Sequence, residues 1–179
     1  AEQYEKGSHR GLFYFIRYVE DMKTAEAETS SAKLPTDEWK RRLLAAEHSP
    51  LRELWFGIKM EIPYWVTVHF VRHHIGVNHY VQSQRNDRQD RYDRNSAPQA
   101  APVSHIMAIN AQELVFMSHR RLCNQASPET RAVMQEIVRQ VNELNPEFAE
   151  FLVPMCVYRN GKCTEFTPCY LNRENKENS

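Results

Sequence analysis

The chain has no excess of charge of either sign, because 23 lysines and arginines balance 23 aspartates and glutamates. No overall electrostatic field therefore recruits nucleic acid or a membrane surface, and an anion site has to be built locally. No apolar run approaches the roughly 20 residues that a membrane helix needs. The nearest candidate, residues 11–19, is interrupted by Arg17 and lacks the small-residue cleavage site of a signal peptide.

Cysteine is scarce as well. The chain has four cysteines and no secretory signal, so we expect reduced structural thiols in a cytoplasmic protein. The gaps between Cys156, Cys163 and Cys169 are wider than the Cys-x2-Cys pairs of common zinc sites. We therefore predict no metal, and a zinc site that also used Cys123 is the alternative.

Metal-binding histidine patterns are missing too. No His-x-x-x-His helix with a nearby acid occurs, which gives a metallohydrolase little support. Three of the eight histidines are interpreted as surface or capping residues rather than ligands: His9, His105 and His119.

What the chain does contain is a globular composition, with 41% hydrophobic and 11% aromatic residues. Its 179 residues suit one domain with one core, so we predict a single domain over residues 1–179. The core is expected to span about residues 10–170, with a polar, frayed tail after Leu171.

Hydrophobic spacing predicts the elements of the first half. Apolar residues in 10–22 indicate a buried strand or a short helix, and small polar residues in 24–36 indicate a surface loop. A helix is expected over 37–46 with Thr36 as its N-cap. Strict alternation over 56–62 then predicts a half-buried strand.

Pro63 is expected to begin a helix that carries Trp65, Val68 and Arg72 on one face and ends near Gly76.

The second half is predicted to be mainly helical. An extended segment over 78–85 and a linker over 96–102 precede a helix over 104–125. The triplet Ser127-Pro128-Glu129 caps a further helix, and Asn160-Gly161 signals a hairpin between Tyr158 and Thr164. The buried stripe of the capped helix is predicted as Val133, Ile137, Val141 and Leu144.

The densest polar segment runs from Arg72 to Arg85, directly after an apolar strand and helix. Its two arginines, three histidines and terminal Ser-Gln-Arg triplet cannot all be buried without partners. Phosphate groups would supply such partners, because the guanidinium fork matches phosphate oxygens in pairs. The segment is therefore interpreted as a nucleotide or dinucleotide site, and a polar loop held by salt bridges is the alternative.

A second candidate cluster lies in the helix expected over 104–125. Asn110, Met117 and Arg121 are separated by seven and four residues, which would place them on one helical stripe. Such a stripe suits a helix that lines a pocket, and it also suits an amphipathic helix whose arginine reaches solvent.

Three elements together resemble the flavin-dependent thymidylate synthase family. Arg72-His73-His74 with the downstream Ser83-Gln84-Arg85 resembles its Arg-His-Arg, Ser, Ser-x-Arg signature. His48-Ser49-Pro50-Leu51 resembles its His-x-Pro-Phe element. Asn110-Ala111-Gln112-Glu113-Leu114, followed by Arg121, resembles its Asn-Ala-Arg-Ser-Leu helix with the uracil-binding arginine.

The resemblance implies an α/β (α+β) fold with a central sheet flanked by helices, assembled as a homotetramer with active sites between subunits. It implies catalytic roles for Arg121, which would hold the pyrimidine, for Ser83 and for His48, which would lie near the carbon donor or flavin. Implied cofactor-binding residues are Arg72, His73, His74, Asn110 and His69. Implied substrate-binding residues are Ser83, Gln84, Arg85, Arg94 and Arg121.

The chain departs from the family pattern at several positions. His74 replaces the second arginine, and His69 stands where glutamine is common. One extra residue lies between Arg72 and Arg85, and only eight separate Arg85 from Arg94, where the family has a long helical insertion. The chain is thus interpreted as a shortened member.

The resemblance implies an enzyme that methylates C5 of a uridine monophosphate, dUMP or UMP. 5,10-Methylenetetrahydrofolate would supply the carbon, and FAD reduced by NADPH would supply the hydride. Its expected partners are a nucleotide substrate and copies of itself, not nucleic acid or a membrane. Two alternatives stay open: C5 hydroxymethylation of a pyrimidine nucleotide, and a non-catalytic nucleotide- or RNA-binding module that uses the arginines from 85 to 94. The interleaved aspartates argue against the latter.

Overall fold

The computed structural model describes residues 14–17, 36–85 and 93–169. The described residues fall into two compact units: β1 with residues 52–110, and residues 36–51 with residues 111–169. A small antiparallel sheet in the first unit and helices in the second agree with the expected α+β class. Most of the loop predicted over 24–36 and the tail after Leu171 lie outside the described residues, and the single domain stays a prediction.

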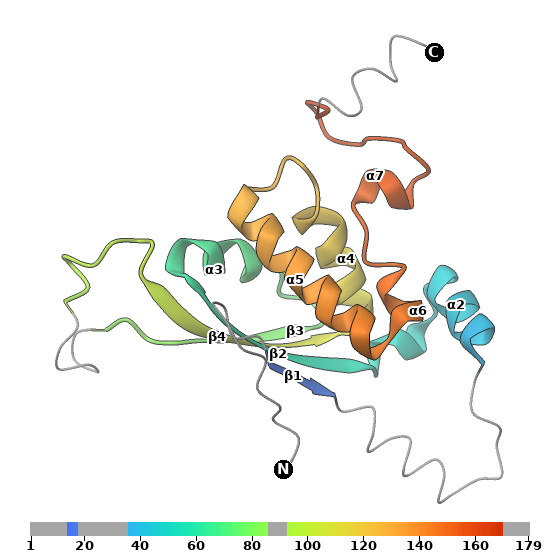
Figure 1. Cartoon of the computed structure of the whole chain (residues 1–179), viewed down its shortest axis with the longest axis horizontal. Coiled ribbons are helices and arrows are strands. Elements are labelled where there is room, and N and C mark those ends of the chain that lie inside the picture. Colours follow the sequence, from blue (N-terminus) through green and yellow to red (C-terminus); the bar gives the residue numbers. More distant parts are fainter. Residues whose placement is uncertain (1–13, 18–35, 86–92, 170–179) are drawn as a thin grey trace, which may run out of the picture. The chain divides into compact units, whose positions relative to one another are not determined.

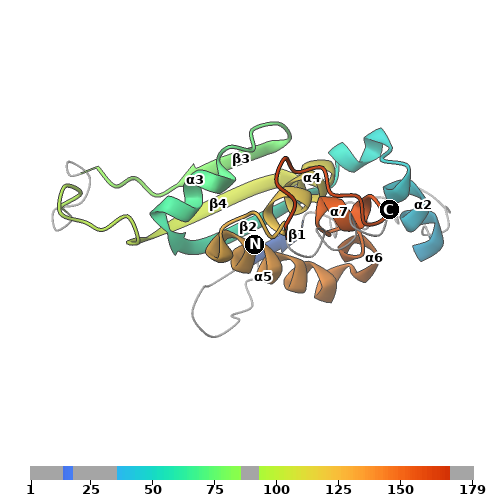
Figure 2. The same cartoon turned by 90° about the horizontal axis from the view of Figure 1, so that it is seen from above.

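The first unit is built on four antiparallel strands in the order β1-β2-β4-β3 (Figures 1 and 2). The sheet is dominated by its two nine-residue strands, which pair over their whole length from Trp55–Asn110 to Pro63–Pro102. The strands are β1 (Tyr14–Arg17), β2 (Trp55–Pro63), β3 (Val77–Val81) and β4 (Pro102–Asn110). The segment predicted over 10–22 as strand or helix thus contains a strand.

The core of the first unit lies on one face of this sheet. The alternation predicted for β2 is confirmed, because Phe56, Ile58, Met60 and Ile62 are buried while Lys59 and Glu61 are exposed. In β4 the buried positions are Val103, His105, Met107 and Ile109. The helix α3 (Tyr64–Phe70) packs against β2 and β4 with Val66, Thr67 and Phe70 buried.

The helix predicted over 104–125 is wrong in its first part. Residues up to Asn110 form β4, and the helix α4 starts only at Ala111 and ends at Arg121. Asn110 is therefore the last strand residue and does not share a helical stripe with Met117. The period of two was hidden because His105 occupies a core position and Ile106 an exposed one.

The helix that Pro63 begins is shorter than predicted. It ends at Phe70, and Val71 caps it, so Arg72 lies in the following turn and not on the helical face with Trp65 and Val68. Gly76 adopts a φ of +73°, a left-handed conformation that glycine tolerates, and leads the chain into β3. The extended segment predicted over 78–85 is a strand through Val81.

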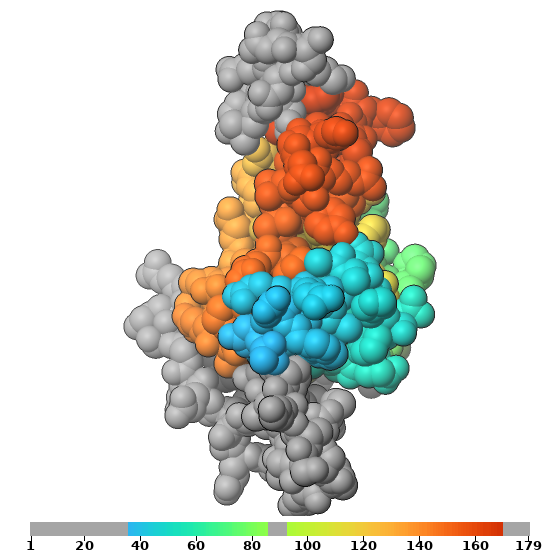
Figure 3. All heavy atoms as spheres, turned by 90° about the vertical axis from the view of Figure 1, so that its right-hand side faces the viewer, coloured from blue at the N-terminus to red at the C-terminus, as the bar shows by residue number. Residues whose placement is uncertain are grey.

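The second unit is helical. α2 (Asp37–Ala45) begins at Thr36, whose side chain accepts a hydrogen bond from the Trp39 backbone N–H, as predicted. α2 contacts α6 (Pro146–Ala149), and Figure 3 shows the face of the second unit on which they adjoin. α4 contacts both α5 (Pro128–Leu144) and α7 (Met155–Tyr158). The Lys40 ammonium pairs with Glu147 and Arg41 with Glu150, which ties α2 to α6 and its C-cap.

Two predictions for the second unit need correction. The buried side of α5 consists of Thr130, Met134, Ile137 and Val141, whereas Leu144 is 39% exposed and Val133 is half-buried. The predicted hairpin is absent, because no strand flanks the turn within 155–169. Asn160 and Gly161 do adopt positive φ values of 52° and 87°, so the turn itself is present and follows α7.

Candidate functional site

The Arg72–His74 turn joins α3 to β3 in the first unit. The Arg72 and His74 side chains are exposed, while His73 is 7% exposed. The His73 N–H donates to the Phe70 carbonyl at 3.0 Å, and His74 Nδ1 lies 3.1 Å from the Arg72 carbonyl oxygen. The turn thus presents a guanidinium and an imidazole to solvent from a hydrogen-bonded backbone.

Asn110 secures the other end of this turn. Its backbone N–H donates to the Gly76 carbonyl at 2.9 Å, and its own side chain is 7% exposed. The Asn110 amide covers Gly76 so closely that a Cβ added there would lie 2.5 Å from Nδ2. The structure thus brings together Asn110 and the Arg72–His74 turn, two elements that the resemblance assigns to flavin.

The remaining predicted site residues of this unit have varied surroundings. His69 lies on α3, half-buried, with its ring edge-on to Trp65 at 5.6 Å. Arg94 is exposed, with its guanidinium 5.8 Å from the centre of the Tyr64 ring. Three residues follow β3: Ser83 and Arg85, which are exposed, and Gln84, which is buried. The Ser83 hydroxyl accepts the Arg85 backbone N–H at 3.3 Å. Arg88 and Arg91 lie outside the described residues.

The charge of the Arg72–Arg85 segment is of one sign. It contains two arginines and three histidines but no aspartate or glutamate. Arginine and neutral or charged imidazole donate hydrogen bonds to phosphate oxygens, and no carboxylate of the segment opposes an anion there. This donor set fits a phosphate-bearing cofactor such as FAD or a nucleotide.

Two histidines of the first unit, His79 and His105, lie close to the Arg72–His74 turn, and the sequence patterns did not predict their position. His105, predicted to be a surface or capping residue, is fully buried on β4, and Nδ1 of His79 lies 2.9 Å from its Nε2. His79 Nε2 in turn lies 2.7 Å from the His73 carbonyl oxygen. Only the pairing of β3 with β4 brings residues 79 and 105 together, so no local sequence signal identifies the pair.

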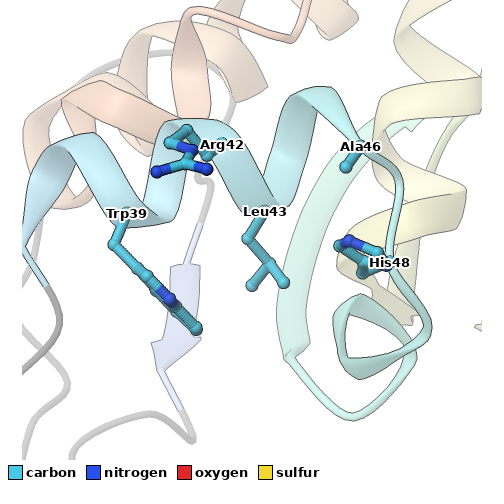
Figure 4. A pocket seen from close by; sticks show the side chains of 5 residues that line it. All are labelled: Trp39, Arg42, Leu43, Ala46 and His48. Carbon is cyan, nitrogen blue, oxygen red and sulfur yellow. The ribbon is translucent and has the colours of Figure 1, made fainter.

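The second unit contains the predicted residue His48, in a cavity of about 530 Å³ beside α2 (Figure 4). Trp39 and Leu43 project from the same side of the helix into this cavity, and Trp39 is 51% exposed. Arg42 and Ala46 complete the lining. An exposed indole beside a guanidinium suits a planar, anionic ligand. Trp39 and Arg42 were missed because their helical spacing is also typical of an ordinary surface helix.

Arg121, the predicted pyrimidine-binding arginine, is the last residue of α4 and is half-buried. In the two helical turns before Arg121, Leu114 and Met117 are buried, so the core of the second unit holds the Arg121 backbone in place. His119, predicted to be a surface or capping residue, is also buried, and its Nδ1 lies 2.8 Å from the Val153 carbonyl oxygen. Burial lowers the pKa of His119, which favours its neutral form.

A second cavity, of about 610 Å³, is lined by all four cysteines of the chain. None of these thiols forms a disulfide, and burial raises the pKa of Cys123. Within 36–85 and 93–169, no group of three or more His, Cys, Asp and Glu side chains is arranged to hold a metal ion. Within the same ranges, no helix is both long and apolar enough to cross a membrane.

One comparison with known proteins bears on part of these residues. The family model described as thymidylate synthase complementing protein matches residues 92–147, a stretch that includes Arg94, Asn110 and Arg121. The match covers less than a third of the chain, and it supports the resemblance to flavin-dependent thymidylate synthases drawn from the motifs. FAD and folate are the cofactors that this family implies. No curated protein sequence matches the chain.

Proposed function

We propose that the chain methylates C5 of a uridine monophosphate, dUMP or UMP, in a flavin-dependent reaction. 5,10-Methylenetetrahydrofolate is the carbon donor, and NADPH is the source of the electrons that reduce FAD. The observation that carries this proposal is the acid-free, arginine- and histidine-rich Arg72–Arg85 segment, in a chain whose residues 92–147 match the family. By family resemblance, the working unit is a cytoplasmic homotetramer.

The residues of the first unit bind and orient in this scheme. Arg72, His73 and His74 hold the flavin together with Asn110, and His69 lies on the preceding helix. Ser83, Gln84 and Arg85 hold the nucleotide and its phosphate, as does Arg94. Their task is positional, because a bound nucleotide reacts as if it were at a very high local concentration.

Arg121 and His48, in the second unit, act on the reacting groups. The Arg121 guanidinium donates to a uracil carbonyl oxygen and stabilises negative charge on it, because its charge is permanent and its donors lie in one plane. His48, in the cavity with Trp39, would lie near the carbon donor or flavin, as the resemblance implies. FAD, when bound and reduced, supplies the hydride, so no nucleophile of the protein is required.

Product analysis tests this proposal. The protein is incubated with FAD, NADPH and methylenetetrahydrofolate and with either dUMP or UMP, and the nucleotide is analysed by mass spectrometry. A C5-methylated product from one nucleotide supports the proposal and names the substrate. A hydroxymethylated product would replace methylation by the alternative chemistry. Binding of RNA that weakens steeply with salt, without bound FAD and without any product, would favour a non-catalytic module.

A further inference from the structure

Three histidines of the first unit form a chain of hydrogen bonds from the core of the sheet to the candidate cofactor turn. In the β3–β4 pairing, His79 lies opposite Met107 and Val81 opposite His105, so both imidazoles project from the same face of the sheet. The chain runs from His105 Nε2 to His79 Nδ1 at 2.9 Å, and from His79 Nε2 to the His73 carbonyl at 2.7 Å.

The contacts limit where the protons of the two imidazoles can lie. The His73 carbonyl oxygen can only accept, so Nε2 of His79 carries a proton. In neutral His79 the Nδ1 atom is then an acceptor, and His105 has to donate from its Nε2. The remaining ring nitrogen, Nδ1 of His105, consequently carries a lone pair and no proton. With His79 neutral, both imidazoles are therefore Nε2–H tautomers.

The burial of His105 supports this assignment. Its side chain is fully buried, with Phe70 packed edge-on at 6.5 Å, and Nδ1 is the one buried side-chain N or O atom of the described residues that has no hydrogen-bond partner. A proton on Nδ1 would leave a buried N–H without an acceptor, which is expensive. Burial, with His79 as a second cause, lowers the pKa of His105 to about 4, so the neutral form prevails near neutral pH.

This hydrogen-bond relay, from His105 through His79 to the His73 carbonyl, ends at the Arg72–His74 turn. His79 holds the His73 carbonyl, and Asn110 holds Gly76, so the backbone that carries Arg72 and His74 is fixed on both sides. We propose that His79 and His105 are positioning residues that set the Arg72–His74 turn for a phosphate-bearing cofactor. This inference rests on the proposed function, since it assigns the turn to cofactor binding. The pair itself touches no reacting group.

Matched variants of His105 test the positioning role by titration with FAD. Glutamine at 105 keeps an N–H donor near the position of Nε2, so H105Q should bind FAD within about twofold of the unchanged protein. Methionine fills similar space without a donor and leaves His79 Nδ1 unsatisfied, so H105M should weaken FAD binding about tenfold or more. Folding of both variants is checked by circular dichroism.

A second pair of variants, at His79, provides a test that does not depend on whether H105M folds. H79Q retains a donor for the His73 carbonyl and should bind FAD nearly as the unchanged protein does. H79M loses that donor and should bind FAD about tenfold more weakly. Equal FAD affinity of H79M and H79Q, or of H105M and H105Q in folded protein, would overturn the positioning role.

Histidine 15N NMR of the unchanged protein without FAD tests the relay separately. The proposal expects His79 and His105 as neutral Nε2–H tautomers at pH 7, and an Nδ1–H tautomer at either residue overturns it. If the tautomers are as expected but the unchanged protein binds no FAD, the proposed function and the positioning role both fail, while the relay stands as a structural feature. FAD binding with the wrong tautomers leaves the proposed function intact and removes the relay.

Discussion

Replacing Gly76 with alanine is expected to destabilise the first unit and to weaken FAD binding, whereas the same change at Gly161 should only strain the backbone. Both glycines have positive φ values, +73° and +87°. An alanine there costs about 1–2 kcal/mol in conformational energy. The two sites differ in space: an added Cβ at Gly161 meets nothing within 4 Å, but at Gly76 it lies 2.5 Å from Asn110 Nδ2 and 3.0 Å from Cγ and Oδ1.

The contact with Asn110 sets the difference between the two variants. Overpacking of this kind costs about 1–3 kcal/mol, so Gly76→Ala should lose about 2–5 kcal/mol and Gly161→Ala about 1–2 kcal/mol. Because Asn110 has to move, and its amide is assigned to the flavin, FAD binding should weaken in Gly76→Ala alone. Asn110→Ala provides the control, since Gly76→Ala in that background should lose only the backbone contribution.

Hydrogen exchange measures each unit by itself. Amides of β4 report on Gly76→Ala and amides of α5 on Gly161→Ala, because exchange from such core elements follows the free energy of opening. FAD titration of the same proteins measures the functional effect. Equal losses of stability in the two variants would refute the reasoning, as would unchanged FAD affinity in Gly76→Ala or a penalty that persists in the Asn110→Ala background.

Three further predictions concern single residues. Arg121→Ala should lose turnover but keep bound flavin, and wild-type rates in that variant would remove its assigned role. His105, whose pKa in the folded state is about 4 and so lies below the ordinary histidine value of 6.5, binds its proton more weakly in the folded state. Its contribution to stability should therefore be intact above pH 6.5 and be lost as the pH falls toward about 4, and urea unfolding of H105Q should lack this loss. Cys123, whose thiol pKa is raised by burial, should be alkylated by iodoacetamide with a midpoint above that of the same thiol in urea; equal midpoints would contradict its burial.

Local sequence patterns correctly predicted the helices and strands whose structure depends mainly on their own side chains. The alternation over β2 specifies a half-buried strand, and Thr36 identifies the start of α2 because an N-cap satisfies its helix locally. β4 was mistaken for helix because its core position is taken by His105 and its exposed face carries Ile106. The turn predicted at Asn160 is present. A turn does not determine the element that precedes it, however, and the helix α7 precedes this turn instead of a strand.

The candidate site was predictable in part for a related reason. The polar density of the Arg72–Arg85 segment is visible along the chain and indicates an anion site. Tertiary pairing decides the rest, since the register of β3 against β4 joins His79 to His105 and the β4–α4 boundary puts Asn110 against Gly76. The sequence alone does not show these tertiary pairings, so it gives no reason to distinguish a buried histidine from an exposed one.

Release of tritium from C5-tritiated dUMP and, separately, UMP tests the central claim most directly. The assay contains FAD, NADPH and methylenetetrahydrofolate, with FAD omitted from the control. We expect release that requires FAD, with one nucleotide preferred and Arg121→Ala inactive. Absence of release from both nucleotides by protein that has bound FAD would contradict C5 substitution of a uridine monophosphate and direct attention to another pyrimidine.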